Sequence, residues 1–93
     1  MTPEYAEIVA IKAVAWLAGA DERILNRFFA ITGATSDDFQ RVAKDNEFGS
    51  TVLEFILGHE KTVIEFCEYS DLPLDAPLLA RQALPGGNLP HWT

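Results

Sequence analysis

Residues 14–39 read VAWLAGADERILNRFFAITGATSDDF, and residues 52–77 read VLEFILGHEKTVIEFCEYSDLPLDAP, so the chain nearly repeats itself. When the two segments are aligned, identical side chains share four positions: Val14 with Val52, Glu22 with Glu60, Phe28 with Phe66, and Asp37 with Asp75. Each segment contains an apolar helix, a break at or beside glycine, an acidic start to a short amphipathic helix, a polar stop and a further acidic start. This near-repeat predicts an all-α architecture, and it predicts no chemistry.

Six helices follow from the start and stop signals, with short connections between them. Thr2, Asp21 and Ser36 are predicted to cap helix starts, and Gly19 and Gly33 suit helix ends. The expected helices cover residues 3–18, 21–32, 36 to about 45, 46–57, 60–69, and 75 to about 84. We therefore predict a compact bundle of about six short helices that forms one domain over residues 1–87, with a loose tail over residues 88–93.

The near-repeat leaves two interpretations of the bundle open. The halves are two pseudo-symmetric three-helix units, or they are similar only because amphipathic helices resemble one another. In both, the helices over residues 3–18 and 46–57 lie at the centre, because the first is apolar on nearly all sides and the second half of the other has a single charge.

The second and third expected helices show which side chains should face the core. The predicted buried stripe consists of Ile24, Leu25, Phe28, Phe29 and Ile31. The side chains expected to face water are Arg23, Asn26 and Arg27. In the next helix, Asp37 and Arg41 are four residues apart, which favours a salt bridge, and the narrow apolar face is Phe39, Val42 and Ala43.

The charge of the chain excludes several classes of function. Its 93 residues contain fourteen acidic and seven basic side chains, for a net charge of −7. Nucleic-acid binding and anionic membrane binding both need clustered basic residues, so neither is expected. The single cysteine, the absence of a basic leader at the start and the lack of a long apolar run predict a soluble cytoplasmic protein.

No motif for catalysis, metal binding or cofactor binding is present. The acidic pairs such as Asp21-Glu22 and Asp37-Asp38 lie where helices begin, so capping explains them better than metal ligation. Cys67 falls on a buried stripe and is expected to be a small core residue, and His59 is expected to be a turn residue. We therefore predict no enzyme activity, no metal, no cofactor and no small-molecule ligand.

The remaining signal is a surplus of apolar surface. Ile8, Ile11 and Ala15 share one arc of the first helix, and the helix around Glu54 has almost no other charge. Either these helices are surrounded on all sides, or they expose a patch that binds another protein or a second copy of the chain. Trp92 in the tail is a further candidate docking residue, which could equally fold back onto the helices or be disordered.

These observations predict a protein–protein interaction module or homodimer. The alternative is an acidic regulator that mimics a polyanion and occupies a basic protein surface.

Several stretches also resemble a known family. The most specific is Arg27-Phe28-Phe29 followed by Thr32-Gly33, and it is joined by residues 15–18, 52–57 and 80–84 and by Gly86-Gly87. With these residues, positions 10–87 are similar to the family of small bacterial proteins catalogued as domain of unknown function 3572. The chain departs from the family's pattern at His59, where Asp is expected, and in the tail. The resemblance implies a compact bacterial helical domain and brings no activity, ligand or catalytic residue.

Overall fold

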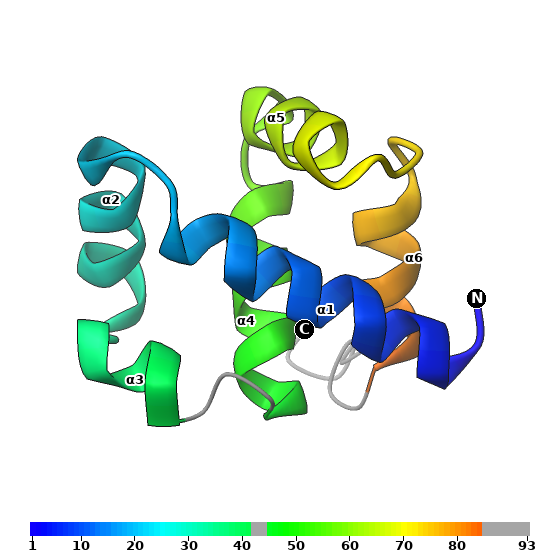
Figure 1. Cartoon of the computed structure of the whole chain (residues 1–93), viewed down its shortest axis with the longest axis horizontal. Helices are drawn as coiled ribbons and strands as arrows, with labels where there is room; N and C mark the ends of the chain where they lie inside the picture. Colours follow the sequence, from blue (N-terminus) through cyan, green and yellow to red (C-terminus); the bar gives the residue numbers. More distant parts are fainter. Residues whose placement is uncertain (42–44, 85–93) are drawn as a thin grey trace, which may run out of the picture.

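A computed structural model describes residues 1–41 and 45–84 of the chain (Figure 1). In this part the chain forms six α-helices and no strand, as predicted. The helices are α1 (Pro3–Ala18), α2 (Glu22–Thr32), α3 (Ser36–Arg41), α4 (Asn46–Leu57), α5 (Glu60–Ser70) and α6 (Ala76–Ala83). Residues 85–93, which include the predicted tail, and Val42 and Ala43 lie outside the described residues.

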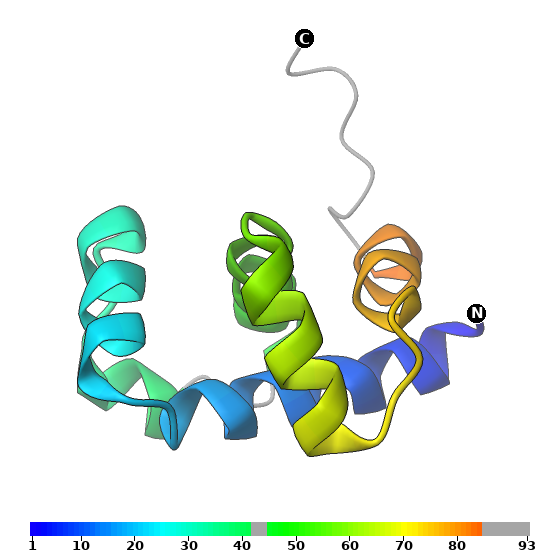
Figure 2. The ribbon, with the colours of Figure 1, turned by 90° about the horizontal axis from the view of Figure 1, so that it is seen from above.

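The six helices are arranged around α1. Figure 2 shows α1 running along one side of the molecule, with α2, α4 together with α5, and α6 standing against it in a row. The closest packing joins α1 to α4 and α1 to α6, and α4 also packs against α6. The prediction that the first and fourth helices are central is confirmed, and α6 is their third partner.

Small side chains on α1 allow this close packing. Its buried face carries Ala6, Ala10 and Ala13, which lie one turn apart, beside the larger Val9 and Leu17. Opposite Ala10 lies Gly49 of α4, where even a Cβ atom would be 2.8 Å from the Cβ of Ala10. Two helices approach this closely only when the residues at the contact are small.

A cluster of aromatic rings joins α2 and α3 to the rest of the molecule. Phe28 is fully buried, and its ring lies 5.2–6.1 Å from four other rings. These belong to Phe29, Phe39, Phe48 and Phe55. Such edge-on and tilted pairs contribute stability beyond the area that they bury.

The near-repeat marks equivalent core positions without making the two halves equivalent. Val14 and Val52 are both buried, and Phe28 and Phe66 are both fully buried. The helices nevertheless pack unequally, because α6 lies against both α1 and α4 whereas α3 lies at the far end of the molecule below α2 (Figure 1). The repeat therefore describes side-chain pattern and helix order, and the packing is not symmetric.

The predicted helix ends are mostly correct, with one correction at α3. Thr2 and Asp21 cap α1 and α2 by accepting backbone N–H bonds, and Gly33 ends α2 in the left-handed conformation. At α3 the capping residue is Thr35 and not Ser36, because the carboxylate of Asp38 accepts the backbone N–H of Thr35 at 2.8 Å. This is half of a capping box, in which the third helical residue reaches back to the residue that precedes the helix.

The expected salt bridge between Asp37 and Arg41 is also wrong, since Arg41 pairs with Asp38 instead. Asp38 is already fixed by its bond to Thr35, and Arg41 joins it from the next turn. The hydrogen bond from the Thr35 N–H and the bond from Arg41 hold the pKa of Asp38 below its ordinary value.

Candidate functional site

The predicted apolar arc of α1 lies on the surface. Ile8 and Ile11 expose 48% and 47% of their area, and Ala15 is exposed as well. We call these three residues the α1 stripe. In Figure 2, α2, α4 and α6 stand on one side of α1 and α5 crosses it, and none of the described helices buries the α1 stripe. Of the two possibilities left open by the sequence, complete enclosure of α1 is therefore wrong.

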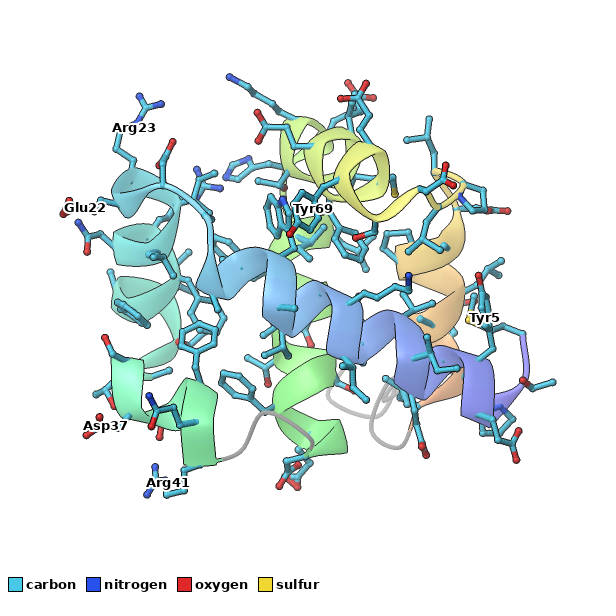
Figure 3. All side chains as sticks on the ribbon, viewed as in Figure 1. Tyr5, Glu22, Arg23, Asp37, Arg41 and Tyr69 are labelled. Atoms are coloured by element: carbon cyan, nitrogen blue, oxygen red, sulfur yellow. The ribbon has the colours of Figure 1, made fainter. Side chains whose placement is uncertain are left out.

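Charged and aromatic side chains border the α1 stripe. Glu4 and Glu7 precede it and Lys12 lies within it, all on the exposed side of α1. Tyr5 is exposed beside the stripe, and Tyr69 of α5 is exposed above α1 in the view of Figure 3. An exposed face of isoleucine with tyrosines and a few charges at its edge has the composition of many protein interfaces.

The surface around Glu54 differs from the expectation. Leu53, Phe55 and Ile56 are buried, so α4 leaves no apolar patch there. Glu54 itself is exposed and accepts hydrogen bonds from Nε and Nη2 of Arg81 on α6, at 3.1 and 2.5 Å. Glu54 therefore links α4 to α6. Trp92, the other candidate, lies outside the described residues.

A cleft lies between α2 and α5. Its volume is about 630 Å³. The side chains that line it come from the first two turns of α2 and the start of α5, with their capping residues: Asp21, Arg23, Ile24, Arg27, His59, Glu60, Lys61, Thr62 and Glu65. We call it the Arg27 cleft.

Arg27 does not face water as the helical pattern predicted. Its guanidinium carbon lies 5.1 Å from the centroid of the Phe55 ring, over the ring face. Its Nε and Nη2 atoms are shielded from solvent and have no hydrogen-bond partner. Burying a donor without an acceptor costs about 1–3 kcal/mol, so this edge of Arg27 is a place where an acceptor would stabilise the protein.

The charges in the Arg27 cleft are not paired with one another. Arg23, Arg27 and Lys61 form no salt bridge with any residue in the described ranges, although Asp21, Glu60 and Glu65 line the same cleft. Three of the seven cations of a chain with net charge −7 thus gather in one cavity. The sequence does not indicate this cluster, because its residues come from two helices, α2 and α5, that are far apart in the chain.

Comparison with known proteins identifies the family of the chain. A family model described as "Protein of unknown function (DUF3572)" matches residues 3–87. The chain belongs to this family. The match spans all six helices and confirms the resemblance, and the family description names no activity. No curated protein and no solved structure matches the chain.

Cys67, the single cysteine of this family member, is a packed core residue. Cys67 is buried, and its thiol donates to the carbonyl oxygen of Pro73 at 3.4 Å. Burial raises the pKa of the Cys67 thiol, and the nearby carboxylate of Asp75 adds to this effect. Within residues 1–41 and 45–84, no group of three or more His, Cys, Asp or Glu side chains could hold a metal ion.

His59 precedes α5, is exposed and lines the Arg27 cleft, and its side chain does not cap the helix. The described helices also include none that is long and apolar enough to cross a membrane.

Proposed function

We propose that this protein is an association module that forms a homodimer through the α1 stripe and performs no catalysis of its own. The observation that carries the proposal is the exposure of Ile8 and Ile11 on one face of α1, although the opposite face of this helix packs against α4 and α6. Isolated exposed isoleucines are common, but two at adjacent turns of one helix, bordered by tyrosines, form a continuous apolar surface.

The order of charges along α1 favours a second copy of the same chain as the partner. If two α1 helices meet antiparallel about a two-fold axis between Ile8 and Ile11, Ile8 of one copy lies opposite Ile11 of the other. The same axis places Lys12 of each copy opposite Glu7 of the other, and Ala15 opposite Glu4. A two-fold interface must be self-complementary in this way, and α1 satisfies the requirement in both its apolar and its charged positions.

The homodimer accounts for the surface of α1 better than the alternative. An acidic regulator that mimics a polyanion would gather its carboxylates on one face, whereas acidic residues occur on each helix from α1 to α5. The proposed location is the cytoplasm, which is consistent with a single cysteine kept as a free, buried thiol.

Sedimentation analysis at high micromolar concentration tests the proposal. The wild-type chain is expected to be a dimer, and Ile8→Glu is expected to be a monomer with an unchanged helical circular-dichroism spectrum. Ile31→Glu is a matched control, because Ile31 is 66% exposed on α2 and outside the α1 stripe. It should leave the dimer intact.

A charge exchange tests the antiparallel arrangement itself. Lys12→Glu alone should weaken the dimer, because it places like charges opposite each other, and Glu7→Lys with Lys12→Glu should restore it. A wild-type chain that remains a monomer, or a double variant no better than the single one, would overturn the homodimer or its antiparallel geometry respectively.

A further inference from the structure

We infer that the Arg27 cleft is a binding site for a small molecule that carries one carboxylate group, held by the guanidinium of Arg27. This site lies between α2 and α5, away from the α1 stripe, and the inference does not rest on the homodimer. The sequence predicted no small-molecule ligand, so this site departs from that expectation.

Two donors on the guanidinium of Arg27 lack a hydrogen-bond acceptor. Nε and Nη2 are the two donors on one edge of the guanidinium, and this edge is shielded and without an acceptor. The same two donors form the fork that binds the two oxygens of a carboxylate side by side. The face of the guanidinium lies over the ring of Phe55. This edge of Arg27 therefore lacks the acceptor that matches it.

Access to this edge comes from the cleft. Arg27 is one of the side chains that line the cavity, and its shielded edge can turn toward the cavity by rotation about the bonds of its flexible stem. The side chains of Glu60 and Lys61 at the opposite wall are exposed and can move aside. After this rotation, the carboxylate of a ligand would take the place of the protein atoms that now cover the donors.

The other residues of the cleft define the chemical class. Arg23 and Lys61 add positive charge near Arg27, which favours an anion. Asp21, Glu60 and Glu65 line the same space and would repel a multiply charged phosphate group, so a single negative charge fits best. Ile24 provides an apolar contact for the body of the ligand. The volume of about 630 Å³ lies within the range of small-molecule sites, about 300–1,000 Å³.

An NMR titration with sodium butyrate tests the inference. The reporter is the Nε–H signal of Arg27 in the ¹H–¹⁵N spectrum, compared at constant ionic strength with titrations of sodium chloride and inorganic phosphate. Butyrate is expected to shift the Arg27 signal and the amide signals of residues 59–62 in a saturable way. Sodium chloride should not do so, and phosphate should do so only at higher concentration.

Two variants test the role of Arg27 in that titration. Arg27→Lys keeps the charge but loses the two-donor fork, so it should weaken butyrate binding by at least about tenfold. Arg27→Gln should abolish it. The matched control is Arg41→Gln, since Arg41 lies on α3 outside the cleft, and it should bind as the wild type does. If Arg27→Gln fails to fold, Arg27→Lys and the wild-type Arg27 signal still decide the question.

Three results would overturn the inference. They are the absence of a saturable shift with butyrate, equal binding by the wild type and Arg27→Lys, or stronger binding of phosphate than of butyrate, which would make the carboxylate class wrong. Repeating the titration on the Ile8→Glu variant separates this site from the proposed dimer, because butyrate binding should be unchanged there even when association is lost.

Discussion

Gly49 of α4 faces Ala10 of α1 at a distance that leaves no room for a side chain, since a Cβ at position 49 would lie 2.8 Å from the Cβ of Ala10. Gly49→Ala should therefore destabilise the protein by about 1–2 kcal/mol, because the clash outweighs the gain of about 1 kcal/mol in helix propensity. Chemical denaturation followed by circular dichroism measures this change in the free energy of unfolding.

A double-mutant cycle separates the clash from the propensity of glycine. In an Ala10→Gly background, the nearest atom of residue 10 to the new Cβ is the Cα, at 3.8 Å, which is an ordinary contact. There Gly49→Ala should stabilise the protein by about 1 kcal/mol, so the sign of the effect reverses. Gly19→Ala is the control, with no neighbouring atom closer than 3.9 Å, and it should change stability by less than about 0.5 kcal/mol. Equal effects of Gly49→Ala in both backgrounds would contradict the close approach of α1 and α4.

The helices of this protein could be predicted from sequence because their signals are local. Thr2, Asp21 and Gly33 act on the backbone within a few residues of themselves, and the structure places caps and stops where the sequence predicted them. The prediction placed the cap of α3 at Ser36, one residue after the actual cap, Thr35. Thr35 and Ser36 both carry hydroxyl groups that suit a helix start, and the hydrogen bond from the Thr35 N–H to Asp38 decides between them.

The surroundings of α2 could not be predicted in the same way. The surroundings of Ile31 and Arg27 depend on how α2 packs against α4 and α5. The periodicity of α2 alone carries no information about this packing. Ile31 falls within the predicted apolar stripe, yet it lies on a groove of about 280 Å³ between α2 and α4 and remains 66% exposed. Arg27 falls on the predicted polar face, yet its guanidinium lies over the ring of Phe55 and it lines the cleft between α2 and α5. The Arg27 cleft thus arises only from the tertiary fold.

Phe28 and Ile31 lie one turn apart on α2 but differ in burial, and this difference can be measured. Phe28→Ala should destabilise the protein by about 3–5 kcal/mol, because Phe28 is fully buried at the centre of the aromatic cluster. Ile31→Ala should cost less than about 1 kcal/mol, although both residues belong to the stripe predicted from sequence. Comparable losses for the two variants in denaturant unfolding would show that Ile31 is part of the core and that α2 packs differently.

The pair formed by Glu54 and Arg81 should contribute to stability more than most surface charges do. Arg81 is 7% exposed and donates two hydrogen bonds to one oxygen of Glu54. Because the Glu54 side chain is largely in solvent, Glu54→Gln is expected to cost only about 1 kcal/mol. Glu68→Gln on the exposed side of α5 is the matched control and should be neutral within about 0.5 kcal/mol. Thermal unfolding of the two variants at equal ionic strength makes the comparison, and equal effects would argue against the link between α4 and α6.

The free energy of unfolding should depend on pH through the thiol of Cys67. Burial keeps the pKa of its thiol above the ordinary value of 9.0, and the S–H group donates to the carbonyl oxygen of Pro73. The unfolded chain therefore loses this proton more readily than the folded protein does. The stability that the neutral thiol contributes is complete below pH 9.0 and declines as the pH rises above it.

The Cys67→Ala variant isolates this effect, because the difference in unfolding free energy between wild type and variant removes other titrating groups. That difference should be constant below about pH 8 and should shrink between about pH 9 and 10. A disulfide reagent offers an independent measurement, since the native thiol at pH 8 should react at least about tenfold more slowly than the thiol of the denatured chain. Rapid reaction of the native protein, together with a pH-independent difference, would mean that Cys67 is exposed and ionises normally. The end of α5 would then not be packed against the segment around Pro73, contrary to the contact seen in the structure.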